Sequence, residues 1–147
     1  MGVREVAFWA AQLSWGLPQT LVGALLCAAQ GRAPRRLFRA ACVTEWRGRA
    51  GLSLGGFVFV PRAQAGAYER AGTPERRLLV HEYGHCVQSL LLGPLYLPLV
   101  VLPSLLWAGL PSAERYRTRH ATSYYAHYPE SWANRLAARV TGEDVPR

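Results

Sequence analysis

The sequence predicts a mainly α-helical α+β protein that associates with a membrane. Two runs without charged residues, 6–30 and 86–113, are long for a chain of 147 residues, and such runs are typical of membrane segments. Between them, residues 37–61 are rich in β-branched and aromatic side chains, which favours a small β-hairpin. We therefore expect an N-terminal transmembrane helix over residues 1–30 and one further domain over residues 31–147.

The charge of the chain does not indicate a nucleic-acid partner. All 17 basic residues are arginines and the formal net charge is +8, but the arginines are scattered, often beside apolar runs, and no DNA- or RNA-binding motif is present. Arginines that flank membrane segments account for this distribution. The three cysteines are odd in number and lack C-x-x-C spacing, so we do not expect a disulfide framework.

The first apolar run is long enough to cross a bilayer as one helix, because residues 6–29 exceed the roughly 20 residues that a span needs. Gln12, Gln19 and Thr20 are too polar to face lipid, so one side of this helix should pack against protein. Pro18 should kink the helix or lie near its mouth.

A cleaved signal peptide that ends near Cys27–Ala29 is the alternative for this run. The charges of Arg4 and Glu5 cancel, whereas a signal peptide begins with a positively charged region. Four arginines follow the run, at positions 32, 35, 36 and 39. The positive-inside rule keeps them in the cytoplasm, which puts the N-terminus outside.

We expect the β-hairpin to pair residues 37–46 with residues 52–61. Gly55–Gly56, inside the second strand, indicates a bulge or a close approach of another backbone. If this strand lies at an edge, it can bind an extended peptide by β-addition; an ordinary half-buried hairpin is the alternative. Residues 62–72 are predicted to form a loop or a short helix.

A helix is predicted over residues 74–92, with sequence signals at both ends. Thr73 is a suitable N-cap, Pro74 suits the first helical position, and Glu75 favours the positive end of the helix dipole. Gly93–Pro94 ends the helix.

The motif H-E-x-x-H occupies residues 81–85 of this helix. His81 and His85 are four residues apart, so they share a face and can hold one Zn²⁺ through their imidazole nitrogens. Glu82 can reach a water on the metal, accept its proton and pass that proton to the leaving amine of a peptide. Gly84 costs helix stability relative to alanine, which indicates that another backbone or a substrate passes close to it.

A catalytic zinc ion needs a third protein ligand and an open position. Glu130, near the start of a last helix predicted over residues 129–140, is the best candidate. Asn134 lies four residues further along, where a short polar side chain can orient a histidine through its second ring nitrogen. For Glu130 itself, a favourable charge at the helix N-terminus is the alternative role. The remaining candidates are His120, His127 and Asp144.

These two segments together resemble a known family. HEYGH at residues 81–85 and ESWAN at residues 130–134 resemble the H-E-x-x-H and E-x-x-A-D pattern of gluzincin metallopeptidases, which include the HtpX-type and CaaX prenyl proteases of membranes. The resemblance implies a minimal zincin-like core, a zinc ion on His81, His85 and Glu130, and hydrolysis of a peptide or protein substrate with Glu82 as general base. The wider sequence is also similar to a group of small, uncharacterised bacterial membrane proteins.

Position 134 departs from the family pattern, because asparagine stands where aspartate is usual. Asn134 still accepts a hydrogen bond from histidine, but it carries no charge. This departure favours a first alternative, a scaffold that keeps the fold without turnover. A second alternative is an intramembrane protease whose third ligand is an aspartate in another span. The only aspartate, Asp144, lies in no apolar segment, which argues against that design.

If Glu130 is a metal ligand, the second apolar run must return to the side of the membrane from which it starts; a single span is the alternative. If residues 90–112 crossed the bilayer once, His81 and Glu130 would lie on opposite sides and could not share a metal. A re-entrant hairpin with two limbs of roughly 10 residues, each half a bilayer long, avoids this. Arginines on both sides of the run place the active site at the cytoplasmic face of the bacterial inner membrane. The hairpin is interrupted by Pro94, Pro98 and Pro103.

A peptidase also needs a donor for the carbonyl oxygen that becomes negative in the transition state. Polar side chains shortly before Glu130 can supply it, and interfacial aromatic packing is their alternative role. These side chains are Tyr124, Tyr125, His127 and Tyr128.

Overall fold

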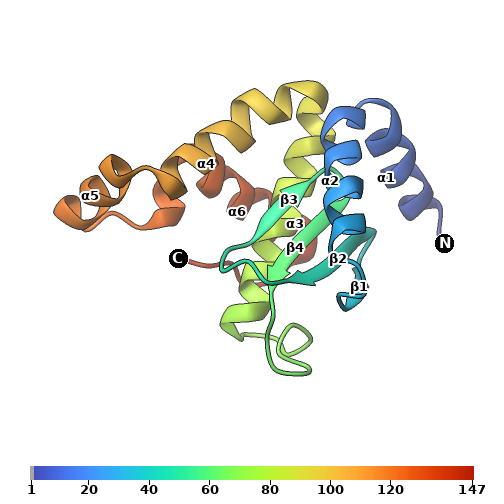
Figure 1. Ribbon diagram of the computed structural model, residues 1–147, viewed down its shortest axis with the longest axis horizontal. Helices are drawn as coiled ribbons and strands as arrows, with labels where there is room; N and C mark the ends of the chain where they lie inside the picture. Colours follow the sequence, from blue (N-terminus) through green and yellow to red (C-terminus); the bar gives the residue numbers. More distant parts are fainter. Residues whose placement is uncertain (1) are drawn as a thin grey trace.

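A computed structural model describes residues 2–147 and shows helices around a small four-stranded sheet, as the predicted α+β class requires (Figure 1). The helices are α1 (Val3–Ser14), α2 (Leu17–Ala29), α3 (Pro74–Leu92), α4 (Leu102–Gly109), α5 (Pro111–His120) and α6 (Tyr128–Thr141). The strands are β1 (Arg35–Phe38), β2 (Ala41–Trp46), β3 (Leu52–Leu54) and β4 (Phe57–Pro61). Three short helical turns complete the fold, η1 (Gly93–Leu95), η2 (Leu97–Val101) and η3 (Tyr124–Ala126).

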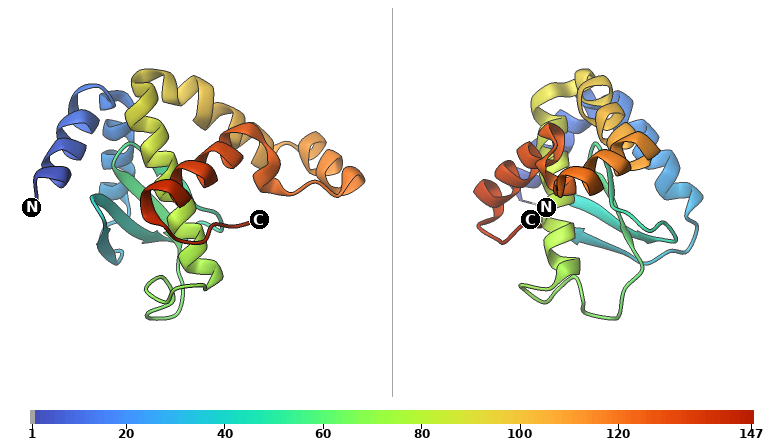
Figure 2. Two further views of the ribbon diagram at one scale, coloured as in Figure 1. Left: turned by 180° about the vertical axis from the view of Figure 1, so that it is seen from behind. Right: turned by 90° about the vertical axis from the view of Figure 1, so that its left-hand side faces the viewer.

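Helix α3 lies at the centre of the molecule. Figures 1 and 2 show α2, the sheet, α3 and α6 as successive layers. The predicted bounds of α3 are confirmed: the Thr73 hydroxyl accepts a hydrogen bond from the N–H of Arg76 at 3.1 Å, and the helix ends at Gly93, whose φ is +54°. Valines of β2 and β4 pack with Leu79 and Val80 of α3 in the main core.

The sheet has the strand order β1-β2-β4-β3, and the expected single hairpin between residues 37–46 and 52–61 is wrong. The chain forms two hairpins, β1–β2 and β3–β4, joined by parallel pairing of β2 with β4. Gly55, with a φ of +62°, makes the tight turn between β3 and β4. Local pairing through this short turn replaces pairing across the longer link at residues 47–51.

The expected close approach at the glycine pair is present. A Cβ on Gly55 would lie 2.8 Å from the Cα of Thr20 in α2, closer than side-chain carbons come to a backbone. Gly55–Gly56 therefore both turns the chain and allows α2 to pack on the sheet.

The expected single helix over residues 6–29 is wrong, because the chain turns at Trp15–Gly16 between α1 and α2. Pro18 lies in the first turn of α2, where its missing N–H costs nothing. In a continuous helix its ring would clash with the carbonyl of Ser14. The two helices pack against each other as a hairpin (Figure 1).

The predicted polar face of this hairpin is confirmed, because Gln12, Gln19 and Thr20 are buried. The Gln12 amide donates to the carbonyl of Cys86 at 3.3 Å. The Gln19 amide donates to the hydroxyl of Ser89 at 2.8 Å and to the carbonyl of Gly93 at 2.9 Å. α1 and α2 are thereby tied to α3.

The second apolar run folds back at a different place from the one expected. The chain turns at η1, directly after α3, and η2 and α4 then form one helical run over Leu97–Gly109. The hairpin therefore consists of α3 and this run, rather than of two short limbs within residues 90–112. Pro98 lies in the first turn of this run, where a proline removes no essential hydrogen bond. Pro103 lies inside the run, directly after the wider π-helical turns of η2, a place where helices depart from regular geometry.

Within residues 2–147, no single helix is both long and apolar enough to cross a membrane. Leu97–Gly109 and Pro111–His120, which meet at 74°, pass that test only together as a bent pair, by length and composition. The membrane association of the chain stays a prediction.

Helices α3 and α6 pack with their backbones in close contact at Gly84. A Cβ on Gly84 would overlap the carbonyl oxygen of Ala133 and lie 3.1 Å from the Cβ of Ala137. Both alanines are fully buried. The close approach expected at Gly84 is therefore made by the backbone of α6.

Gly84→Ala should lower the free energy of unfolding by about 1–3 kcal/mol, because overpacking forces two backbones apart. Chemical denaturation in detergent measures this. The matched control is Gly109→Ala, where a Cβ would meet nothing within 4 Å, and it should unfold like the wild type. Wild-type stability of the Gly84→Ala protein would contradict the tight contact.

Candidate metal centre

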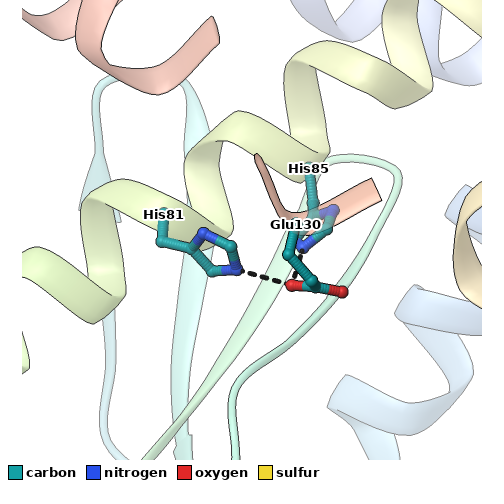
Figure 3. Close-up of side chains that lie close together, drawn as sticks. All are labelled: His81, His85 and Glu130. Atoms are coloured by element: carbon teal, nitrogen blue, oxygen red, sulfur yellow. Dashed lines mark hydrogen bonds and ion pairs between the residues drawn. The ribbon is translucent and has the colours of Figure 1, made fainter. Parts of the chain in front are cut away.

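Two helices bring together a group of buried side chains that can hold a metal ion. His81 and His85 lie one turn apart on α3, and Glu130 lies in the first turn of α6 (Figure 3). The Glu130 Oε2 atom is 3.0 Å from His81 Nε2 and 3.3 Å from His85 Nε2. The three ligand atoms lie within 4.8 Å of one another, and all three residues are buried.

The second ring nitrogen of each histidine has a polar partner. His81 Nδ1 lies 2.7 Å from the Asn134 Oδ1 atom, and His85 Nδ1 lies 2.7 Å from the Gln88 Oε1 atom. If Nδ1–H donates in each pair, Nε2 is left with a free lone pair that faces Glu130. The Gln88 amide donates in turn to the carbonyl of Pro129 at 2.8 Å. These contacts hold both rings in the orientation that a metal ligand needs.

The electrostatics of the group suit a cation. Burial alone raises the pKa of Glu130, but hydrogen bonds to His81 and His85 outweigh this and hold the pKa below its usual range. Burial lowers the pKa of His85, but its hydrogen bond to Glu130 and the charges of Glu82 and Glu130 together outweigh this and hold the pKa above its usual value. The second carboxylate oxygen of Glu130, Oε1, is buried without a hydrogen-bond partner. Two imidazole nitrogens and a carboxylate fit a divalent cation, which would replace the protons of this group.

Glu82 lies beside the group and is held from the sheet. Its carboxylate oxygen Oε2 accepts a hydrogen bond from the hydroxyl of Ser53 on β3 at 2.7 Å. Gly51 leaves room for this carboxylate, because a Cβ there would overlap the Glu82 Oε1 atom. Glu82 is 5% exposed, so a water or substrate in the adjoining cavity can reach it.

The group opens into a cavity of about 430 Å³. Residues 49–53, which include the first two residues of β3, form one wall, and the apolar run of η2 and α4 forms another. Tyr124 and Tyr125 of η3 also line it. The Tyr125 ring packs edge-on against His81, with ring centroids 5.0 Å apart.

Only two of the four predicted oxyanion donors line this cavity. Tyr124 and Tyr125 line it. Burial, followed by the charges of Glu82 and Glu130, raises the pKa of Tyr125, so its hydroxyl stays protonated and can donate. Elsewhere, the His127 ring stacks on Trp107 at 4.7 Å between centroids, and the Tyr128 hydroxyl donates to the carbonyl of Leu99.

The remaining candidates for a third ligand lie outside the group. His120 is exposed at the end of α5 and packs against Tyr116. Asp144 is exposed and lies 3.8 Å from Arg77. Neither belongs to the cluster of potential metal ligands found among the described residues.

Sequence reasoning missed Ser53 and Gln88. Gln88 carried a usable signal, because it is a polar residue three positions after His85 on the same helix. Ser53 carried none, since its contact with Glu82 depends on how β3 packs on α3. The chain matches no protein-family model, no curated protein and no solved structure.

His81→Ala, His85→Ala and Glu130→Ala should each lose bound metal, because two remaining donors hold a cation poorly. Elemental analysis of the purified protein should find ~1 divalent metal ion per wild-type chain, as expected for a single site. His120→Ala is the control and should keep the metal. Full metal content in all three ligand variants would rule out this site.

The partners of the histidines should have graded effects. Asn134→Ala and Gln88→Ala should each weaken metal binding by roughly 10- to 100-fold, as measured by competition with a chelator. Asn134→Asp should bind at least as tightly as the wild type, because it adds a charge opposite His81. Unchanged affinity in both alanine variants would mean that these contacts do not support the ligands.

Proposed function

We propose that this protein is a zinc metallopeptidase of the gluzincin type. The observation that carries the proposal is the convergence of His81, His85 and Glu130 in one cavity with Glu82 beside them. Two histidines and one glutamate are the ligand set of catalytic zinc in several peptidases. The resemblance of HEYGH and ESWAN to the gluzincin pattern supports the same conclusion.

The side chains of the cavity have complementary roles in this reaction. Zinc, when bound, acts as a Lewis acid and lowers the pKa of water towards 7. Glu82, oriented by Ser53, accepts a proton from the attacking water and passes it to the leaving amine. The hydroxyls of Tyr125 and Tyr124 are donors for the carbonyl oxygen as it becomes negative.

We assign peptide binding to β3. This strand lies at one end of the sheet order, so its outer edge is not paired with another strand of the sheet. Residues 51–53 line the cavity, and an extended peptide that pairs with this edge passes next to Glu82. A peptide or protein substrate therefore fits better than a small molecule.

A catalytically inactive scaffold is the second candidate, and the asparagine at position 134 favours it. Asn134 lies 2.7 Å from His81 Nδ1 but provides no negative charge to increase the basicity of that ligand. Loss of such a partner reduces metal affinity or activity in comparable sites.

Glu82→Gln separates the two candidates. It should keep the metal but reduce hydrolysis of an unstructured protein such as casein by roughly 10²- to 10⁴-fold, the usual contribution of a general base. The rate of hydrolysis is measured from the new amino termini that cleavage creates. Glu114→Gln, at an exposed position of α5, is the control. A scaffold shows no turnover in any form, and equal turnover of wild type and Glu82→Gln removes Glu82 from the mechanism.

We also propose that two helical hairpins insert into one leaflet of the bacterial inner membrane, with the active site at its cytoplasmic face. One hairpin consists of α1 and α2, and the other of α3 and the run Leu97–Gly109. The turn between α1 and α2 meets the turn after α3, where the Gln19 amide donates to the carbonyl of Gly93 and the Trp15 ring packs on that glycine. Large apolar side chains are exposed along these helices, and surfaces of this kind mark membrane contacts. They include Leu13, Leu21, Leu25, Leu91, Leu95, Leu99, Leu102 and Leu106.

Lengths and charges support insertion from one side. α1 has 12 residues and α2 has 13, so each is roughly 20 Å long against a hydrocarbon core of about 30 Å. Arginines lie at or beyond the helix ends that point away from the shared turns. They include Arg4, Arg32 and Arg115. On this proposal the N-terminus lies on the cytoplasmic side, not outside as a single span would require.

Single cysteines at three exposed positions test this topology in a cysteine-free background. Gly2→Cys, Ala71→Cys and Thr118→Cys should all react with a membrane-impermeant thiol reagent from the cytoplasmic side only. Labelling of the Gly2→Cys protein from the outside would show that the first segment crosses the bilayer. Opposite labelling of the other two would separate α3 from α5 and contradict the fold.

A further inference from the structure

Arg117 lines the same cavity as the candidate metal ligands. Its guanidinium group lies over the Trp107 ring, with Cζ 4.9 Å from the centroid, and 5.7 Å from the centroid of Tyr124. One of its N–H groups donates to the carbonyl of Trp107. These contacts hold a half-buried positive charge in one place, unlike the exposed Arg49 on the opposite wall.

Among residues 2–147, no carboxylate pairs with this charge. Arg36 pairs with Glu45 and Glu69, and Arg76 pairs with Glu143. Arg117 forms no ion pair with any carboxylate in the part of the chain that the structure describes. Because a guanidinium is always charged and offers a fork of donors that matches a carboxylate, such a group at a cavity wall is suited to bind one.

Aromatic rings connect Arg117 to the metal centre. Tyr124 contacts the guanidinium group, its ring packs edge-on against Tyr125 at 5.3 Å between centroids, and Tyr125 packs against His81. Two rings therefore separate Arg117 from a metal ligand. Since one residue of extended peptide spans about 3.3 Å, a group bound by Arg117 belongs to a residue only a few positions from the scissile bond.

The charge balance of the cavity also favours an acidic substrate. Two arginines and two glutamates line it, and a divalent cation on the ligand group would leave an excess of positive charge. The wall next to Arg117 is apolar, with Val101, Leu105 and Ala108 facing the cavity. A peptide that combines apolar side chains with a carboxylate matches these two surfaces.

Resting on the proposed peptidase function, we propose that Arg117 determines substrate specificity by binding a carboxylate of the peptide. That carboxylate belongs either to an aspartate or glutamate near the scissile bond or to the C-terminus of the substrate. Both sources present the same two oxygens to the guanidinium group.

Matched fluorogenic peptides test the proposal. Each peptide has an apolar Leu-Phe core, with alanine at the other positions. A glutamate is placed at each flanking position in turn, and each glutamate peptide is compared with a twin that has glutamine at that position. A further pair differs only in a free or amidated C-terminus. At one position, or at the free C-terminus, the acid should raise kcat/KM by about 10-fold, the lower range for a charge-assisted hydrogen bond at a partly exposed site.

Arg117→Glu should invert this preference, so that a lysine twin becomes the better substrate than the glutamate peptide. A role confined to packing against Trp107 would lower all rates together without inverting the order. The matched control is Arg115→Gln, an exposed neighbour on α5, which should keep the wild-type preference. Arg117→Lys should still prefer the acidic peptide, but with a smaller ratio of kcat/KM values between the acidic peptide and its twin.

Peptide binding separates failure of this proposal from failure of the peptidase function. Fluorescence anisotropy with the Glu82→Gln protein should show the same preference for the acidic twin, even if no peptide is cleaved. Equal binding of all twins to this protein overturns the role of Arg117. The proposal is also overturned if the Arg117→Glu protein keeps the preference for the acidic peptide but no longer binds phosphatidylglycerol vesicles in a flotation assay. Arg117 would then bind lipid headgroups rather than substrate.

Discussion

The close contact between α3 and α6 is the constraint on which the rest of the structure depends. Gly84 has no side chain, and the carbonyl of Ala133 occupies the space where a Cβ would lie. This contact brings Glu130 to the two histidines although 45 residues separate it from His85. If α3 and α6 lay further apart, the buried carboxylate of Glu130 would lose its histidine partners. A buried charge without partners lowers the stability of a protein by several kcal/mol.

The N-terminal hairpin holds α3 in place for this contact. Gln12 and Gln19 are fully buried, and buried polar groups must find partners. Their amides bond to Cys86, Ser89 and Gly93, along the second half of α3 and the turn that follows. Buried polar side chains therefore hold one face of α1 and α2 against the protein, while large apolar side chains such as Leu13 and Leu21 stay exposed on the other face.

One residue of the sheet joins three parts of the cavity. The Ser53 hydroxyl bonds to the carboxylate of Glu82, and its backbone carbonyl accepts a hydrogen bond from the Tyr96 hydroxyl at 2.8 Å. The edge strand, the helix with the base and the apolar run after it are thus fixed relative to one another. This arrangement gives the proposed peptide-binding edge and the proposed general base a constant separation.

The sequence by itself determined the features that depend on local spacing. The cap at Thr73, the pairing of His81 with His85 and the start of α6 follow from residues within one or two helical turns. Glu130 was found because its chemistry and its neighbour Asn134 limited the choices. The turn at Trp15–Gly16 had a local signal in Pro18, but a kinked helix has the same signal. Only the tertiary structure decided the strand order and the contacts of Ser53, because each depends on packing between separate segments of the chain, for which local propensity carries no information.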